Sequence, residues 1–130
     1  MEGIEPGLTG EVERLVTEDD TAERWGSGLV PVFGTPSLVG LMENAAVESL
    51  DGHLPPHQTS VGGRLDVRHL APTPVGMRVR ARAELTEREG HRLEFRIEAW
   101  DEIECIGRAS HTRFIIERWG FIEQAQSKAR

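Results

Sequence analysis

The sequence has no tyrosine, few other aromatic residues and a single cysteine, and each scarcity excludes a class of protein. Aromatic residues make up 5% of the 130 residues, too few for the stacking surfaces that bind single-stranded nucleic acid. One cysteine, Cys105, excludes an intramolecular disulfide and a cysteine-rich metal site. No apolar run approaches the roughly 20 residues that span a membrane, and no secretory signal is visible. We therefore expect a cytoplasmic protein with no membrane association and no metal.

Basic residues are scarce in the first half of the chain. Residues 1–60 carry 11 acidic and two basic side chains, whereas residues 61–130 carry 11 acidic and 13 basic ones. The net charge of −7 has the wrong sign for a protein that binds a phosphate backbone, so no nucleic-acid partner is expected. A local basic surface in the second half would suit a compact anionic ligand. The length predicts a single domain over residues 1–130 that buries its own core.

One buried helix is predicted after residue 34. Thr35 suits the N-cap, and Pro36 suits the first helical position, where its missing N–H costs nothing. Apolar residues follow densely as far as Leu50, and Asp51-Gly52 ends the helix. Before it, residues 11–17 favour a weak strand and residues 18–22 a turn or short helical piece.

The remainder predicts strands. Apolar and polar residues alternate over residues 61–69, 77–86 and 92–99, and a long final strand runs from 103 to about 117. Short turns between the last three make them antiparallel neighbours with one buried face. The sequence therefore predicts an α+β fold, in which a curved antiparallel sheet wraps around one central helix. Such a sheet leaves a strand edge uncovered, and a second copy pairing there would give a homodimer.

Three polar residues are candidates for chemistry. Glu43 stands on the helix among apolar neighbours, where burial would raise the pKa of its carboxyl group and make it an acid or base. The competing interpretation is a glutamate that reaches solvent or pairs with an arginine. His69 follows Val61, Gly63, Leu65 and Val67 at every second position, so it is expected on the same inner face of the strand. There it would complete an acid/base pair, unless it only caps the core. Thr35 lies where a helix N-terminus stabilises negative charge, although an N-cap role alone would explain it.

Two further features lie on the strands. Gly62-Gly63 marks a bulge, a close approach of a ligand to the backbone, or a bend in the sheet. The other histidines, including His111 on the final strand, are expected at the surface. No dinucleotide fingerprint, P-loop or nucleophile-elbow motif occurs, so no cofactor is expected.

The order and spacing of several segments resemble the fluoroacetyl-CoA thioesterase-like family, whose members have the hotdog fold. The similarity runs over nearly the whole chain from about Gly7. It includes Val32-Phe33-Gly34-Thr35-Pro36, Leu41-Met42-Glu43-Asn44-Ala45-Ala46, and residues 60–62, 67–76, 90–95, 99–102, 106–107 and 110–113.

This resemblance implies roles for individual residues. The family's catalytic threonine, the glutamate eight positions later and the histidine 26 positions after that are matched by Thr35, Glu43 and His69. The glycine matched by Gly62 lies against the acyl thioester. His111 and Arg113 match a His-x-Arg pattern close to the site, and Arg113 is expected to contact the phosphates of CoA.

The stretch before the helix departs from the family pattern. The fluoroacetyl-specific enzyme has a phenylalanine-rich lid there, whereas residues 25–32 of this chain are shorter and contain Gly26, Ser27, Gly28 and Leu29. We expect residues 25–33 to form part of the pocket entrance, with Phe33 in contact with the substrate. The predicted substrates are short or medium acyl-CoAs without a strong fluoroacetyl preference.

The resemblance and the candidate residues together predict hydrolysis of a small acyl-CoA thioester to free acid and CoA. Glu43 would act as nucleophile or general base, and His69 would move protons. Thr35 and the backbone near Gly62 would orient the thioester. CoA is part of the substrate. The alternatives are a hotdog hydratase or dehydratase, and a non-catalytic module that binds acyl-CoA or another small ligand.

Overall fold

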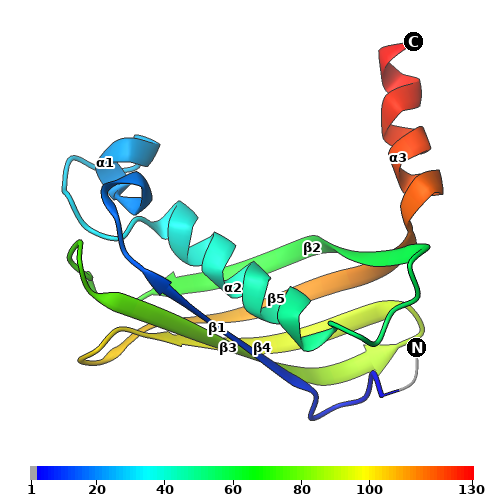
Figure 1. The fold of residues 1–130 in the computed structure, drawn as a ribbon, viewed down its shortest axis with the longest axis horizontal. Coiled ribbons are helices and arrows are strands. Elements are labelled where there is room, and N and C mark those ends of the chain that lie inside the picture. Colours follow the sequence, from blue (N-terminus) through cyan, green and yellow to red (C-terminus); the bar gives the residue numbers. More distant parts are fainter. Residues whose placement is uncertain (1–2) are drawn as a thin grey trace.

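Five antiparallel strands form one curled sheet around helix α2 in the computed structural model, which describes residues 3–130 (Figure 1). The order across the sheet is β1-β3-β4-β5-β2. The elements are β1 (Thr9–Leu15), α1 (Ala22–Trp25), α2 (Thr35–Ser49), β2 (Gln58–His69), β3 (Arg78–Glu89), β4 (Arg92–Trp100), β5 (Cys105–Glu117) and α3 (Arg118–Gln126). The predicted α+β arrangement, a curved antiparallel sheet around a central helix, is confirmed.

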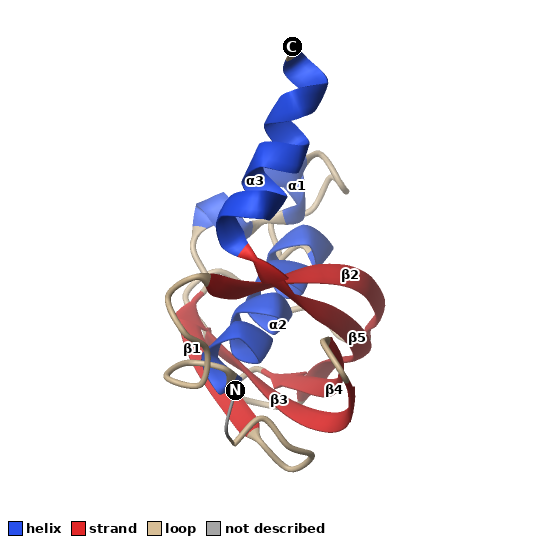
Figure 2. Ribbon diagram, turned by 90° about the vertical axis from the view of Figure 1, so that its right-hand side faces the viewer, coloured by secondary structure: helices blue, strands red, loops and turns tan. Residues whose placement is uncertain are grey.

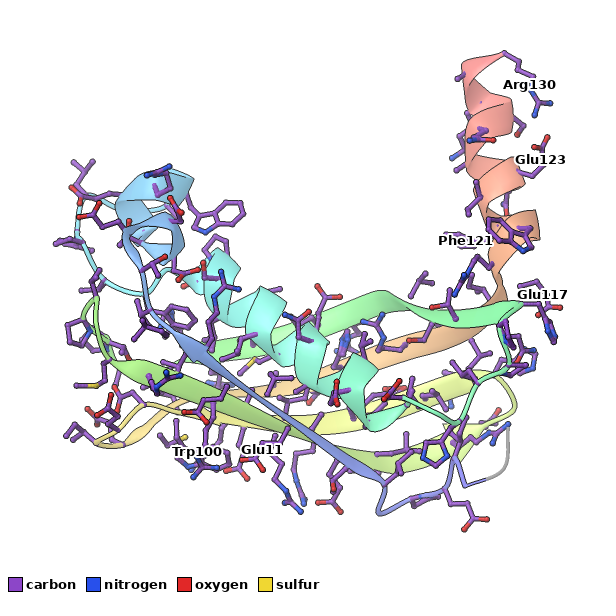
Figure 3. The ribbon with its side chains drawn as sticks, in the orientation of Figure 1. Glu11, Trp100, Glu117, Phe121, Glu123 and Arg130 are labelled. Carbon is purple, nitrogen blue, oxygen red and sulfur yellow. The ribbon has the colours of Figure 1, made fainter. Side chains whose placement is uncertain are left out.

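The concave face of the sheet carries the core. Every second residue points inward along β4 and along β3 as far as Leu85, and these side chains pack against the apolar residues of α2. The outer face is charged: Arg80 pairs with Glu11 at 2.9 Å, and its guanidinium stacks over Trp100 at 4.5 Å. Figure 3 shows Glu11 and Trp100 on the side of the sheet away from α2. The strict alternation predicted for these strands therefore reflects one buried and one solvated face.

Strand β1 crosses α2 at very close range. A Cβ atom on Gly10 would lie 2.3 Å from the backbone nitrogen of Ser49 and 2.4 Å from the carbonyl oxygen of Ala45. No other residue fits there without moving the helix backbone. Gly10 thus fixes how deeply α2 sits within the curl of the sheet.

Strand β2 contains a bulge that changes the side-chain phase. Its pairing with β5 shifts between Gly62 and Arg64, so Gly63 is the extra residue. The prediction that Val61 and Gly63 share the inner face with His69 is therefore wrong. Before the bulge the inner residues are Ser60 and Gly62, and after it they are Leu65, Val67 and His69, as their partners on β5 show.

Helix α2 begins one residue earlier than predicted. Gly34 is the N-cap, without a side-chain cap, and Thr35 is already in the first turn together with Pro36. The hydroxyl of Thr35 is therefore free of the capping role and available to another partner. Upstream, a short 3-10 helix (Glu18–Asp20) and α1 fill the region predicted as a turn or short helical piece.

Helix α3 was not predicted. It leaves the end of β5 and projects from the sheet on the same side as α2, ending well beyond the rest of the chain (Figures 1 and 2). None of its residues is buried, and a hydrogen bond from the Arg118 amide to the His57 carbonyl, at 2.9 Å, holds its start against a loop. Within residues 3–130 no helix is long and apolar enough to cross a membrane.

Candidate active site

Thr35 and His69 meet at one end of α2. The Thr35 hydroxyl lies 2.8 Å from His69 Nδ1, a hydrogen bond between the first turn of the helix and the last residue of β2. Burial lowers the pKa of His69 below its ordinary value, so the imidazole is neutral near pH 7. Its Nε2 atom is buried and, among residues 3–130, has no partner at hydrogen-bond geometry, although the Ala71 backbone partly offsets the fall in the pKa of the ring. An orphaned buried polar atom costs about 1–3 kcal/mol, which a ligand or an added side chain here would relieve.

Glu43 lies two turns further along α2 and pairs with Arg113 of β5. Its Oε2 atom is 3.2 Å from Arg113 Nη1, and its side chain is 41% exposed. It is therefore not the buried, unpaired carboxylate considered from the helix pattern, but one held by an arginine. Arg113 itself is buried, with a side chain only 6% exposed.

Four of the five N–H donors of Arg113 are used inside the protein. Besides Glu43, its Nε donates to Ser60 Oγ at 2.9 Å, its Nη2 to the Ser60 carbonyl at 2.9 Å, and its Nη1 to His111 Nε2 at 3.2 Å. The guanidinium thus points into the interior, and only one N–H donor would remain for the predicted contact with CoA phosphates. The other four contacts hold the Arg113 side chain in place, so that it orients the Glu43 carboxylate.

His111 completes this support, and its predicted surface position is wrong. The residue is 2% exposed, and its Nδ1 lies 2.7 Å from the Arg64 carbonyl. Because a carbonyl only accepts, Nδ1 carries the proton, which leaves the Nε2 lone pair to accept from Arg113. Burial, and secondarily the charge of Arg113, lowers the pKa of His111. The neutral form is the one that fits this network.

Gly62 leaves the space that the Glu43 carboxylate occupies. A Cβ atom on Gly62 would lie 2.8 Å from Glu43 Oε2 and 3.3 Å from His111 Cε1. Gly62 faces inward because the bulge follows it directly. Gly62 therefore lies next to the candidate carboxylate, and its backbone is exposed.

A single chain does not bring all the candidate residues together. The eight residues from Thr35 to Glu43 rise about 12 Å along a helix, and the span from Gly62 to His69 is about 20 Å of extended strand. The structure joins Thr35 with His69, and Glu43 with Gly62 and Arg113, at two separate places.

Residues 25–33, the predicted pocket entrance, are partly exposed to solvent and partly buried in the core. Trp25, Leu29 and Val30 are exposed, whereas Phe33 is completely buried in the hydrophobic core. Contact between Phe33 and a substrate would need this segment to move. A hollow of about 230 Å³ beside it is lined by Val32, His69, Leu70, Ala71 and Pro72.

A hollow of about 550 Å³ lies on the outer face of β2, β4 and β5 and contains none of the candidate residues. It is lined mainly by charged side chains at the surface. In the described part of the chain, no three histidine, cysteine or acidic side chains are grouped so as to hold a metal ion.

Ser60 is the site residue that sequence reasoning missed, and His111 was placed close to the site only by the resemblance to the family. Ser60 precedes the glycine pair without any motif of its own, and its contact with Arg113 exists only because β2 pairs with β5. His111 carried a signal, since it alternates with buried residues on the final strand.

Comparisons with known proteins relate most of the chain to one enzyme family. Residues 16–119 match the family model described as fluoroacetyl-CoA-specific thioesterase, FlK. The fluoroacetyl-CoA thioesterase of Streptantibioticus cattleyicolor is 39% identical over 97 residues, which cover 75% of this chain and 70% of that protein.

Solved structures agree with this relationship. A structure of the fluoroacetyl-CoA thioesterase FlK superposes with a TM-score of 0.91 at 32% identity and covers 98% of both chains. A phenylalanine-to-alanine variant of that enzyme has been crystallised with fluoroacetate and CoA. A hotdog-like protein from Thermanaerovibrio acidaminovorans, with a TM-score of 0.85 at 24% identity over 95% of this chain and 91% of its own, supports the fold alone. By its sequence and its hotdog fold, the chain belongs to the family of fluoroacetyl-CoA-specific thioesterases.

Proposed function

We propose that this chain hydrolyses the thioester of a small acyl-CoA to a free acid and CoA. Family membership supports this activity. The observation that carries it is the 2.8 Å hydrogen bond between Thr35 and the neutral His69, whose other ring nitrogen is buried and unpaired. A hydroxyl and an imidazole at the start of a buried helix suit a carbonyl that develops negative charge.

The proposed roles follow from the contacts. Arg113 holds Glu43 in one orientation, so its carboxylate can attack the thioester carbon or take the proton of an attacking water. In both routes the carbon gains an oxygen, the C–S bond breaks, and the sulfur leaves as a thiolate. In the nucleophilic route the acyl group is then held on Glu43 as an anhydride, which water hydrolyses to the free acid and the original carboxylate. In both routes that water is the source of the proton that the thiolate takes up. His69 is neutral at rest, so it first takes up a proton released from the water and then passes it to the thiolate. Thr35 and the Gly62 backbone orient the thioester.

We further propose that the working site forms in a homodimer. Strand β2 is a 12-residue edge strand, and no strand within residues 3–130 pairs with its outer side. Such an edge can pair with a strand of a second chain. Antiparallel pairing of two β2 strands about an axis at Asp66 would set Gly62 opposite the partner's His69. Gly63 is an extra residue at the bulge, so Gly62 and His69 lie the same number of paired positions from Asp66. The inward-facing residues of one β2 strand are then opposite the inward-facing residues of the other. The partner's Thr35–His69 pair would thereby lie near Glu43.

Thiol release from a panel of acyl-CoAs tests the activity. The proposal expects free CoA thiol, detected with a thiol reagent, at a rate that Glu43→Gln and His69→Ala abolish. Loss of enoyl absorbance without thiol would overturn it in favour of a hydratase. Tight binding with neither change would overturn it in favour of a binding module.

Disulfide trapping tests the dimer independently. In a Cys105→Ser background, Asp66→Cys places two thiols opposite each other across the proposed axis and should give a covalent dimer under mild oxidation. Glu13→Cys, exposed on the other edge strand β1, is the matched control and should stay monomeric on a non-reducing gel. A monomer in sedimentation at micromolar concentration would contradict the proposal. A cytoplasmic location and the lack of a nucleic-acid partner stay predictions from the sequence.

A further inference from the structure

Helix α3 lacks the contacts that a helix of its length needs. It has nine residues and none is buried, whereas isolated helices shorter than about 12–15 residues are marginal in water. Its apolar side chains stand in solvent: Trp119 is 66% exposed, Phe121 44% and Ile122 38%. Figure 3 shows Glu123 on the part of α3 that stands away from the sheet, with Phe121 nearer the base of the helix. Another surface is therefore needed to stabilise this helix.

A second exposed apolar surface lies at the opposite end of the same chain. It is formed by Trp25, Leu29 and Val30, which are 56%, 95% and 50% exposed. Figure 1 shows α1 and α3 at the two ends of the sheet, both on the side that carries α2. Within one chain the two surfaces are too far apart to touch.

The charges of the two segments are complementary. Residues 18–32 carry four acidic side chains and one basic one, a net charge of −3. Residues 118–130 carry three basic side chains and one acidic one, a net charge of +2. Two copies of either segment would repel each other, whereas one of each would attract.

The proposed dimer brings these unlike ends together. An axis perpendicular to the sheet at Asp66 exchanges the two ends of β2 and leaves both central helices on one side. It therefore moves the partner's α3 to the end of the sheet where α1 and residues 25–30 lie. We propose that α3 of each protomer packs on residues 25–30 of the other and forms the outer wall of the entrance to the acyl site; this rests on the proposed dimer.

The contact would act on the site through the first turn of α2. Trp25 Nε1 donates to Ser37 Oγ at 2.9 Å, two residues beyond Thr35. A helix that covers Trp25 and Leu29 restricts how far this segment can open. The C-terminal helix thereby becomes part of the entrance of its partner.

Cross-linking with a matched pair of variants tests this inference. In the Cys105→Ser background, Leu29→Cys is combined with Ile122→Cys, or with Gln124→Cys as the control. Successive helical residues are about 100° apart, so positions 122 and 124 face nearly opposite directions. The Ile122 pair should form disulfide-linked dimers about tenfold faster, because neighbouring thiols have a high effective concentration.

The companion variant Asp66→Cys separates the possible failures. If it cross-links while the Ile122 pair is no faster than the Gln124 pair, the role of α3 is overturned and the dimer stands. If neither Asp66→Cys nor the Ile122 pair cross-links, both proposals are overturned.

Discussion

Replacing Gly62 with alanine should displace the Glu43 carboxylate while leaving the fold intact. The added Cβ would lie 2.8 Å from Glu43 Oε2, closer than a carbon and an oxygen approach without bonding. The carboxylate is the end of a flexible side chain that is 41% exposed, so it can move away. The strand backbone does not have to move, and alanine is at least as stable as glycine within a strand.

Displacing the carboxylate should weaken the interaction between Glu43 and Arg113. Their 3.2 Å contact is already long for a charge-assisted hydrogen bond, and a shift of a few tenths of an ångström breaks it. A misplacement of about 1 Å at a reacting group can cost about 100-fold in rate. We therefore expect kcat to fall by about 10- to 100-fold, with a change in unfolding free energy below about 1 kcal/mol.

The assay is thiol release from acetyl-CoA, with urea unfolding on the same samples. Gly63→Ala is the matched control, since it alters the same bulge but its Cβ would press on the Phe114 ring, 2.5 Å away on the outer face. Full activity of Gly62→Ala would refute the role of this contact. An equal loss in Gly63→Ala would show that the bulge backbone, and not Glu43, is responsible.

Three other changes give separate tests. Glu43→Gln should abolish turnover and lower the free energy of unfolding in urea by about 1–3 kcal/mol, because the buried Arg113 loses its charge partner. Glu48→Gln on the same helix is the control. A gain in stability of Glu43→Gln would contradict the pairing with Arg113. Burial lowers the pKa of His69 and His111 in the folded state, so the unfolded chain binds more protons just below pH 6.5 and stability should fall as the pH drops through that range. His111→Gln should show a smaller drop in the urea midpoint between about pH 7.5 and about pH 5.5 than the parent protein, and an equal drop would exclude His111 as a source. For selectivity, kcat/KM should favour fluoroacetyl-CoA over acetyl-CoA by less than about a thousandfold, because one small contact in a pliable pocket contributes about 1–3 kcal/mol. A larger ratio would overturn our interpretation of residues 25–33.

The predictable parts of the fold are those with a strict pattern. The alternation is uninterrupted along β4 and along β3 as far as Leu85, after which the pairing of β3 with β4 shifts at a bulge. Every residue assigned inward from Val79 to Leu85 and from Leu93 to Ala99 is buried. The bulge at Gly63 was one of several possibilities for the glycine pair, and only the pairing with β5 shows how it changes the inner face. Helix α3 has no apolar stripe at helical spacing, so no local sequence pattern predicts it.

For the candidate site, the sequence singled out Thr35, Glu43 and His69, but not their arrangement. Whether Glu43 is unpaired or held by an arginine depends on Arg113, which is 70 residues away. The tautomer of His111 depends on a carbonyl of the neighbouring strand. Such contacts are set by strand register, which a single sequence does not encode locally.

The strand order also bears on how the chain folds and where it opens. Strands β3, β4 and β5 are consecutive in the chain and adjacent in the sheet, so their contacts need only short loops to close. Strand β1 pairs with β3, although α2 and β2 lie between them in the chain. Strand β2 pairs with β5, although β3 and β4 lie between them. Both edge strands therefore pay a larger loop-closure entropy when they pair. In native-state hydrogen exchange, the amides of β4 should therefore open only with global unfolding, and those of β2 at a lower free energy. The strand that carries Gly62 and His69 is thus the one whose native pairing gains most from a second chain.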